Sequence, residues 1–381
     1  MREGWEYKRL GELCDIVMGQ SPMGNSINEN NGIEFHQGKT NFGDKFLMES
    51  GIYTTSPIRI AEKKTILLCV RAPVGIINIT DRQVCIGRGL SSLKPRLGLE
   101  LLYLYYCLLS KQNYFESNST GSTFKAISSK VINNTIIQFP PKSTQLSIVS
   151  ELDKLNELIR IKKEQLKDYD ALAQSIFYEM FGDPVENEKG WEVKKLMEVC
   201  DVRDGTHDSP KYVESSNYML ITSKNIVNRA ISFDDVNYIT EEDYNNINKR
   251  SKVDNGDILM PMIGTIGNPV IVYLDNLHKF SIKNVALIKF LHNTSILNRY
   301  LLELMISESF RRYLLSLNKG GTQKFVALGT IRRMDIILPP LPLQQSFAQK
   351  IEQIEQQKAA IQKTITDLET LLAARMQYWF D

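Results

Sequence analysis

Residues that usually carry out covalent chemistry are few in this sequence and lack the spacing that catalysis needs. There are four histidines, with no H-E-x-x-H motif and no pair at metal-ligand spacing, which argues against a catalytic metal site. The loop GQSPMGNS, which starts at Gly19, resembles a phosphate-binding loop, but Asn25 stands where that loop needs its lysine. The sequence therefore predicts a protein that is not an enzyme and holds no cofactor or metal of its own.

Unlike residues for catalysis, basic and amide side chains occur in patterns that suit the binding of a polyanion. Between Arg71 and Arg96 the chain carries five arginines or lysines and a single acid, Asp81. Lysine and arginine neutralise phosphates, arginine also pairs with guanine, and asparagine or glutamine pairs with adenine. Two glycine loops, SNSTGSTFK from Ser117 and NKGGTQKF from Asn318, add further threonines and lysines. A second interpretation stays open, in which these are solvated polar loops without a ligand.

Length and composition describe a globular chain with local rather than global charge. The 381 residues are 43% hydrophobic and 24% charged, which predicts two domains with sizeable cores. Lys and Arg total 46 against 44 Asp and Glu, so any DNA-binding surface has to be local. Five widely spaced cysteines without a C-x-x-C pair predict buried free thiols. Without an apolar run long enough for a membrane span or a signal peptide, we expect a cytoplasmic protein.

The chain is a tandem repeat. The segment GWEYKRLGELCD at Gly4 matches GWEVKKLMEVCD at Gly190, and FPPKSTQ matches LPPLPLQ further along, with Phe181 and Phe380 closing the two copies. The copies differ in length within their bodies and agree in length over their final quarter. Loops tolerate insertions, whereas a helix with a fixed register does not, so the final quarters are predicted to be long helices.

Heptad spacing supports this prediction. Apolar residues recur at alternating steps of four and three in both final quarters, which is typical of a coiled-coil seam, and each seam has a polar residue near its middle, Lys162 or Lys358. The seam residues are Ile148, Leu152, Leu155, Ile159 and Leu166 in the first copy and Ile351, Ile354, Ile361, Ile365 and Leu368 in the second. Two such seams should pair, with the lysines as polar layers that fix the helix register. The alternative is an ordinary amphipathic helix packed on its own domain.

The bodies, residues 1–141 and 188–342, contain short β-branched runs separated by Gly, Asn and Pro, and one helical stretch each, from Leu99 and from Ile296. We therefore expect an α+β fold: two β-rich domains joined by helices at 142–187 and 343–381, related by an internal pseudo-two-fold repeat.

These features resemble the specificity subunit of a type I restriction-modification enzyme. The resemblance covers essentially the whole chain, since both bodies are followed by a Pro-Pro-x-x-x-Gln helix that ends in Phe. The first body, with GQSP, FHQGK, LLCVRAPVG and CIGRGL, is similar to one group of target recognition domains. The second, with DGTHDSPKY, ITSKNI and GDILMPMIGTIG, is similar to another.

The resemblance implies a division of labour. Each target recognition domain would read one half of a split site in double-stranded DNA, while paired antiparallel helices set the spacer between the halves. Two methyltransferase subunits, which hold S-adenosylmethionine and methylate adenine N6, would dock on the helices, and two restriction subunits, which use ATP and magnesium, would complete the enzyme. The competing interpretation is a tandem-domain scaffold that tethers protein partners and does not bind DNA.

Candidate DNA-binding residues are the basic and polar side chains of the loops named above. They are Gln20, Ser21, Lys39, Arg71, Arg88, Thr123 and Lys125 in the first domain, and Thr206, His207, Lys224, Lys283, Thr322, Gln323 and Lys324 in the second. For His207 an alternative role in capping a turn stays open.

Overall fold

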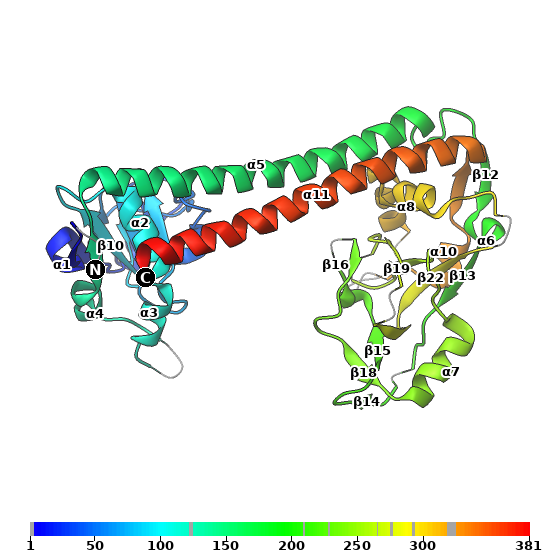
Figure 1. Ribbon diagram of the computed structural model, residues 1–381, viewed down its shortest axis with the longest axis horizontal. Coiled ribbons are helices and arrows are strands. Elements are labelled where there is room, and N and C mark those ends of the chain that lie inside the picture. Colours follow the sequence, from blue (N-terminus) through cyan, green and yellow to red (C-terminus); the bar gives the residue numbers. More distant parts are fainter. Residues whose placement is uncertain are drawn as a thin grey trace. The chain divides into compact units, whose positions relative to one another are not determined.

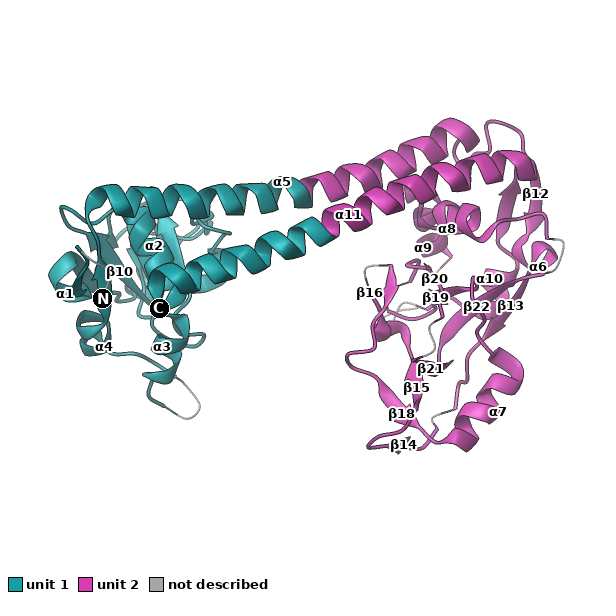
Figure 2. Ribbon diagram, viewed as in Figure 1, with its two compact units in different colours: residues 1–163, 363–381 teal, residues 164–362 magenta. Residues whose placement is uncertain are grey.

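The computed structural model describes residues 4–121, 125–208, 210–227, 229–264, 266–274, 277–291, 294–317 and 325–381. The chain forms two compact units (Figure 2): Met1–Lys163 with Lys363–Asp381, and Glu164–Gln362. Two 40-residue helices, α5 (Lys142–Phe181) and α11 (Leu341–Phe380), contribute residues to both units (Figures 1 and 2).

The body of the first unit is built on three sheets. A four-stranded antiparallel sheet has the order β2-β10-β7-β8, and a five-stranded sheet has the order β3-β5-β4-β9-β6, in which only β4 and β9 are parallel. A third pair joins β1 to β11. The strands are β1 (Glu6–Arg9), β2 (Cys14–Met18), β3 (Ile27–Asn28), β4 (Ile33–His36), β5 (Tyr53–Thr54), β6 (Ile60–Ala61), β7 (Thr65–Cys69), β8 (Ile77–Thr80), β9 (Val84–Ile86), β10 (Leu90–Pro95) and β11 (Ile136–Phe139). The helices are α1 (Leu10–Leu13), η1 (Gly24–Ser26), η2 (Lys39–Asn41), α2 (Leu101–Ser110), α3 (Gln112–Ser117) and α4 (Ser129–Asn134).

The body of the second unit repeats this plan. Its antiparallel sheet β13-β22-β19-β20 matches β2-β10-β7-β8, its pair β12-β23 matches β1-β11, and its sheet β14-β18-β15-β21 also contains one parallel pair, β15 with β21. A separate hairpin joins β16 to β17. The strands are β12 (Glu192–Lys195), β13 (Cys200–Asp204), β14 (Tyr212–Val213), β15 (Tyr218–Ile221), β16 (Ile226–Val227), β17 (Ala230–Ile231), β18 (Asn237–Ile239), β19 (Ile258–Pro261), β20 (Val270–Ile271), β21 (Lys279–Ile282), β22 (Val285–Phe290) and β23 (Asp335–Leu338). The helices are α6 (Leu196–Val199), η3 (Ser223–Asn225), α7 (Glu241–Ser251), α8 (Asn298–Ile306), α9 (Glu308–Ser316) and α10 (Leu328–Arg332). The predicted α+β fold with an internal repeat is confirmed.

Each long helix is fastened at its start by a buried glutamine of the repeated Pro-Pro-x-x-x-Gln motif. Gln145 accepts a hydrogen bond from the Glu100 N–H at 2.9 Å, and Gln344 accepts one from the Leu297 N–H at 2.8 Å. Each glutamine also donates to two backbone carbonyls, one of them in the Pro-Pro pair. Since both side chains are fully buried, losing any of these bonds would leave a polar group without a partner. The motif is therefore structural.

The phenylalanine that ends each copy closes a core. Phe181 lies 4.8 Å from Tyr300 and 5.1 Å from Phe347, ring centre to ring centre, within the second unit. Phe380 lies 5.6 Å from Tyr103 within the first. Each long helix thus ends in the core of a body, and α11 ends in the body at the opposite end of the sequence, because Phe380 and Tyr103 share one core.

The two long helices pack antiparallel within each unit. In the first, Glu151 of α5 binds Arg375 of α11, and Lys163 binds Glu369. In the second, Asp170 binds Lys358 at 2.9 Å and Phe177 contacts Phe347. The predicted seam residues are all buried or half-buried. Seam residues near the helix ends, such as Ile148 and Ile351, also belong to the cores of the bodies, so the seam is continuous with them.

Other predictions from composition can be compared with the structure. The five cysteines are free and buried, as predicted. Among the described residues, no helix combines the length and the apolar character that crossing a membrane requires. Within the same part of the chain, no three His, Cys, Asp or Glu side chains gather in a way that could hold a metal ion.

Candidate nucleic-acid interface

A basic hollow lies at one edge of the first body. Lys39, Arg71 and Arg88 line it together and come from three separate segments: η2, the loop after β7, and the crossover from β9 to β10. Its volume is about 310 Å³, and no Asp or Glu is found among the described residues that line it. Such a hollow suits an anionic group, because nothing in its lining opposes negative charge.

Two glycines in or beside this hollow lie very close to neighbouring backbone. A Cβ on Gly19 would lie 2.2 Å from the Gly87 carbonyl oxygen, and one on Gly89 would lie 2.2 Å from the Gln37 carbonyl oxygen. No other residue fits at these positions without moving the backbone. The GRG segment that includes Arg88 is thus explained by loop packing.

Gln20, Ser21 and Lys125 contact the segments that line the hollow. The Gln20 N–H donates to the Ile86 carbonyl at 3.0 Å, and the Ser21 hydroxyl accepts from the Arg88 N–H at 3.5 Å. The Lys125 carbonyl accepts from the Ala72 N–H at 3.1 Å. Loops from four parts of the sequence therefore meet here. Thr123 lies outside the described residues.

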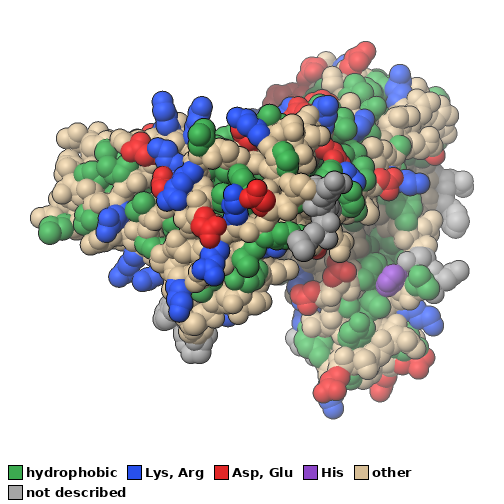
Figure 3. All heavy atoms as spheres, turned by 60° about the vertical axis from the view of Figure 1, so that its left-hand side comes forward, with side chains coloured by type: hydrophobic (Ala, Val, Ile, Leu, Met, Phe, Trp, Pro, Cys, Tyr) green, Lys and Arg blue, Asp and Glu red, His purple; other side chains and the backbone are tan. Residues whose placement is uncertain are grey.

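The basic stretch between Arg71 and Arg96 does not form one free surface. Arg82 binds Glu34 and Arg96 binds Asp15, which are both far away in sequence. On the face shown in Figure 3, Lys and Arg side chains are spread out and interspersed with Asp and Glu. Counting charges along the sequence missed these acids, because the fold brings them in from other strands.

Glu34, in β4, is the centre of a buried polar network. Its carboxylate accepts from Arg82 Nε at 2.7 Å, from His36 Nε2 at 2.8 Å and from the Ser50 N–H at 2.7 Å. Burial alone would raise the pKa of Glu34, but these hydrogen bonds outweigh it and hold the pKa below its usual value. Burial lowers the pKa of His36, which favours the neutral imidazole. The network holds β4, whose next residues, Gln37 to Lys39, line the hollow. No sequence pattern pointed to it.

Thr206 and Lys224 of the second body lie at positions equivalent to candidates of the first. The Thr206 N–H donates to the Ile282 carbonyl at 3.0 Å, as Gln20 does to Ile86, and Thr206 is bridged to Lys283. Lys224 lies in η3, which follows β15 as the η2 of Lys39 follows β4, and it pairs with Asp235 at 3.0 Å. Arg71 has Ile263 as its counterpart, because Arg71 bridges Ala126 just after the glycine loop of the first body and Ile263 bridges Phe325 at the end of the glycine loop of the second. Thr322, Gln323 and Lys324 lie outside the described residues.

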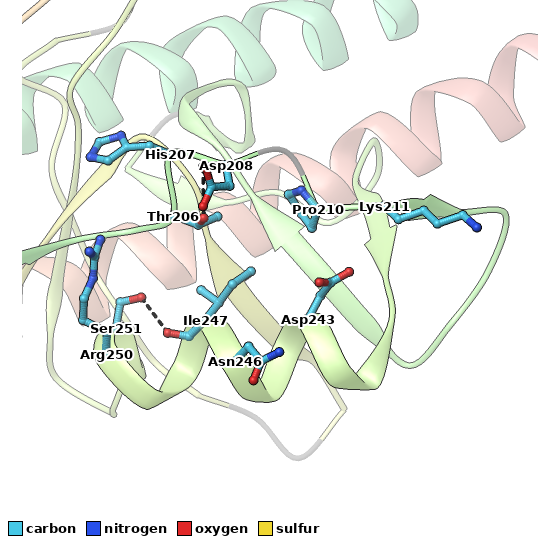
Figure 4. A pocket seen from close by; sticks show the side chains of 10 residues that line it. All are labelled: Thr206, His207, Asp208, Pro210, Lys211, Asp243, Asn246, Ile247, Arg250 and Ser251. Atoms are coloured by element: carbon cyan, nitrogen blue, oxygen red, sulfur yellow. Dashed lines mark hydrogen bonds between the residues drawn. The ribbon is translucent and has the colours of Figure 1, made fainter.

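Charged side chains concentrate beside Thr206 and His207. Both residues line a hollow of about 670 Å³ against α7, shown in Figure 4. Asp204 accepts from His207 Nε2 at 2.6 Å and from Arg250 Nη2 at 2.7 Å. Arg250 and Asp204 also line a neighbouring hollow with Arg203, Lys249 and Arg332 among its cations. Asp204 and Arg250 are 46 residues apart, so only the fold reveals their pairing.

Comparisons with known proteins agree on one family. A family described as "Type I restriction modification DNA specificity domain" matches residues 2–168 and 188–370. Two curated relatives from Methanocaldococcus jannaschii match most of the chain. The type I restriction enzyme MjaIX specificity subunit is 24% identical over 96% of this chain and 90% of its own length. The MjaVIII specificity subunit is 22% identical over 93% and 86%.

A further relative and two solved structures extend the comparison. The putative MjaX specificity subunit from the same organism is 34% identical, over 46% of this chain and 42% of the relative, so the match spans less than half of that protein. The S subunit of a type I restriction-modification system from M. genitalium has a TM-score of 0.54 at 16% identity, covering 99% of this chain and 96% of that one. A chain from a study of type I R-M complex assembly and conformational transition has a TM-score of 0.65 at 18% identity, covering 100% and 98%. These two similarities concern the fold.

Proposed function

Because the chain belongs to the type I restriction-modification DNA specificity family, we propose that it is the sequence-recognition subunit of such a complex. The observation that supports the proposal is the repeated loop cluster, in which Gln20 and Thr206 make the same backbone hydrogen bond and the helices of Lys39 and Lys224 follow equivalent strands. Two similar readers in one chain fit a DNA site with two separate half-sites.

Each body would bind one half-site through its loops. In the first, Lys39, Arg71 and Arg88 would neutralise phosphates or contact base edges from the basic hollow. In the second body, the contacts to phosphates or base edges would come from Thr206, His207, Lys224 and Lys283. With a net charge of only +2, the isolated chain should bind DNA modestly, and increasing salt should weaken that binding.

The long helices would set the spacer and dock the partner subunits. A 40-residue helix is about 60 Å long, and α5 and α11 are bound to each other in both units. We propose two methyltransferase subunits, which would bring S-adenosylmethionine and methylate adenine N6, and two restriction subunits, which would bring ATP and magnesium. This chain would act without a cofactor, in the cytoplasm where its DNA and partners are.

The test is to co-express the chain with its methyltransferase partner in a host that lacks adenine methylation and to map modified bases across the genome. A split motif methylated on both strands is expected. A stable complex that methylates nothing, although the same methyltransferase is active with another specificity subunit, would refute the proposal and favour the protein-tethering scaffold.

A further inference from the structure

In each body a crossover leads from the parallel strand pair to the antiparallel sheet, which contains β10 in the first body and β22 in the second. The first crossover is one residue longer, and the two match when they are counted from their first residues. In the first body residues 87–89 connect β9 to β10, and in the second residues 283–284 connect β21 to β22. The Gly87 N–H donates to the carbonyl at the end of β4 at 2.7 Å, and the Lys283 N–H donates to that at the end of β15 at 2.9 Å. These matched bonds make Gly87 the counterpart of Lys283. The next residue is Arg88 in one body and Asn284 in the other.

The same position of the repeat contacts this residue in both bodies. Ser21 and His207 each lie two residues after a matched glycine, Gly19 and Gly205. The Ser21 hydroxyl lies 3.5 Å from the Arg88 nitrogen, and His207 Nδ1 lies 3.2 Å from Asn284 Oδ1. In the second body the contact is to the side chain, so it sets where the Asn284 amide points.

Hydrogen bonds to Asp204 hold His207 in this contact. His207 Nε2 lies 2.6 Å from one Asp204 oxygen, and Arg250 Nη2 binds the other at 2.7 Å. Arg250 also donates to the Gly205 carbonyl at 3.1 Å, which ties α7 to the same loop. Figure 4 shows His207 and Arg250 at the same end of the hollow. The series from Arg250 through Asp204 and His207 to Asn284 therefore holds the amide in place.

The chemistry of the two crossover residues differs in a way that matches DNA bases. An arginine side chain pairs with guanine O6 and N7, whereas an asparagine side chain pairs with adenine N6 and N7. The contact with His207 engages one hydrogen-bonding group of the Asn284 amide. In either orientation of the amide, an N–H donor and the carbonyl acceptor remain for adenine. Arg88 is exposed at the basic hollow.

We propose that Arg88 and Asn284 are base-reading residues at one equivalent position of the two bodies. Arg88 selects a guanine in one half-site, and Asn284 selects an adenine in the other. His207, held by Asp204, is a positioning residue for Asn284. This inference rests on the proposed function, because it names the bases that the two readers select.

The backbone decides which substitution tests Asn284. Its φ is +55°, in the left-handed region, where alanine would add strain and glycine would not. Asn284→Gly therefore removes the amide and keeps the turn. Asn284→Asp keeps the shape but leaves only acceptors, which favours cytosine N4 over adenine. Asn245→Ala, on the exposed side of α7, is the matched control.

The experiment maps methylation motifs of the variant chains, each co-expressed with the methyltransferase partner. Asn284→Gly should reduce the preference for one adenine in one half-site by about 5- to 150-fold. Arg88→Ala should reduce the preference for one guanine in the other half-site by a similar factor. His207→Ala should reduce the preference for the same adenine by a smaller factor. Asn284→Asp should shift the preferred base at that position toward cytosine. Asn245→Ala should leave the motif unchanged.

Several outcomes would overturn the inference. One is an assembled Asn284→Gly or Asn284→Asp complex with the wild-type motif, and another is Arg88 and Asn284 variants that relax the same half-site. If His207→Ala changed the motif at a base that the Asn284 variants do not affect, His207 would not be a positioning residue for Asn284. If the wild-type complex yields no split motif at all, the proposed function fails, which differs from a motif that is present but insensitive to these variants.

Discussion

Replacing Arg82 with methionine should destabilise the first body because it removes the main partner of a buried carboxylate. Glu34 is 8% exposed and accepts two hydrogen bonds from the Arg82 guanidinium, at 2.7 and 3.0 Å. Removing one partner of a fully buried ion pair costs about 3–5 kcal/mol. The Arg82 side chain is 36% exposed, so water can partly replace it, and we expect a loss of about 2–3 kcal/mol at pH 7.

The loss should depend on pH with a defined sign. In the wild type the pKa of Glu34 is lowered, so its contribution to stability is present above about pH 4.3, the unfolded value, and disappears as the pH falls through the lower folded value. In Arg82→Met, one of the interactions that oppose the effect of burial is lost, so the pKa of Glu34 rises above its wild-type value and acid protonates the variant first. The difference in unfolding free energy between wild type and variant should therefore shrink toward acid.

Urea unfolding of the wild type and the variant at pH 7 and at acidic pH measures both effects. Arg160→Met is a suitable control, because Arg160 pairs with Glu157 on the surface of α5, where such pairs contribute about 0–1 kcal/mol. If Arg82→Met cost no more than Arg160→Met, or cost the same at both pH values, the reasoning about Glu34 would be wrong. Hydrogen exchange along β4 should locate the loss, since Glu34 lies in that strand.

Three further predictions concern the helices and the thiols. Lys358→Ile removes the ion pairs to Asp170 and Glu355 from the seam. If the lysine fixes the helix register, crosslinks between α5 and α11 in this variant should report more than one register, and a single unchanged register would refute that role. Inserting four helical residues, about 6 Å, after Lys163 should change the methylated spacer and leave both half-sites unchanged, and altered half-site bases would contradict the spacer role of α5. Burial raises the pKa of four thiols to about 12. At pH 8 these thiols should therefore react with an alkylating reagent only as fast as the chain unfolds, and rapid labelling of the folded chain would contradict their burial. These thiols belong to Cys14, Cys69, Cys107 and Cys200.

The features that the sequence determined by itself are periodic or repeated along the chain. The heptad pattern predicted the two long helices, since an apolar residue on every turn demands a continuous partner, and the structure has them at α5 and α11. The internal match from Gly4 and Gly190 onward predicted two bodies of one plan, which the paired sheet orders confirm. Such signals survive in a single sequence because they depend on neighbours within a few turns or on the comparison of one segment with another.

The site depended on contacts between residues far apart in sequence, which only the tertiary structure decides. Arg82 and Arg88 look alike along the chain, yet Arg82 is bound to Glu34 while Arg88 lines the basic hollow. Likewise, nothing near His207 in sequence announces Arg250 or Asn284, because strand pairing and the packing of α7 bring them together. Whether a charge is free to meet a ligand depends on which opposite charge the fold places beside it, and local composition carries no record of that.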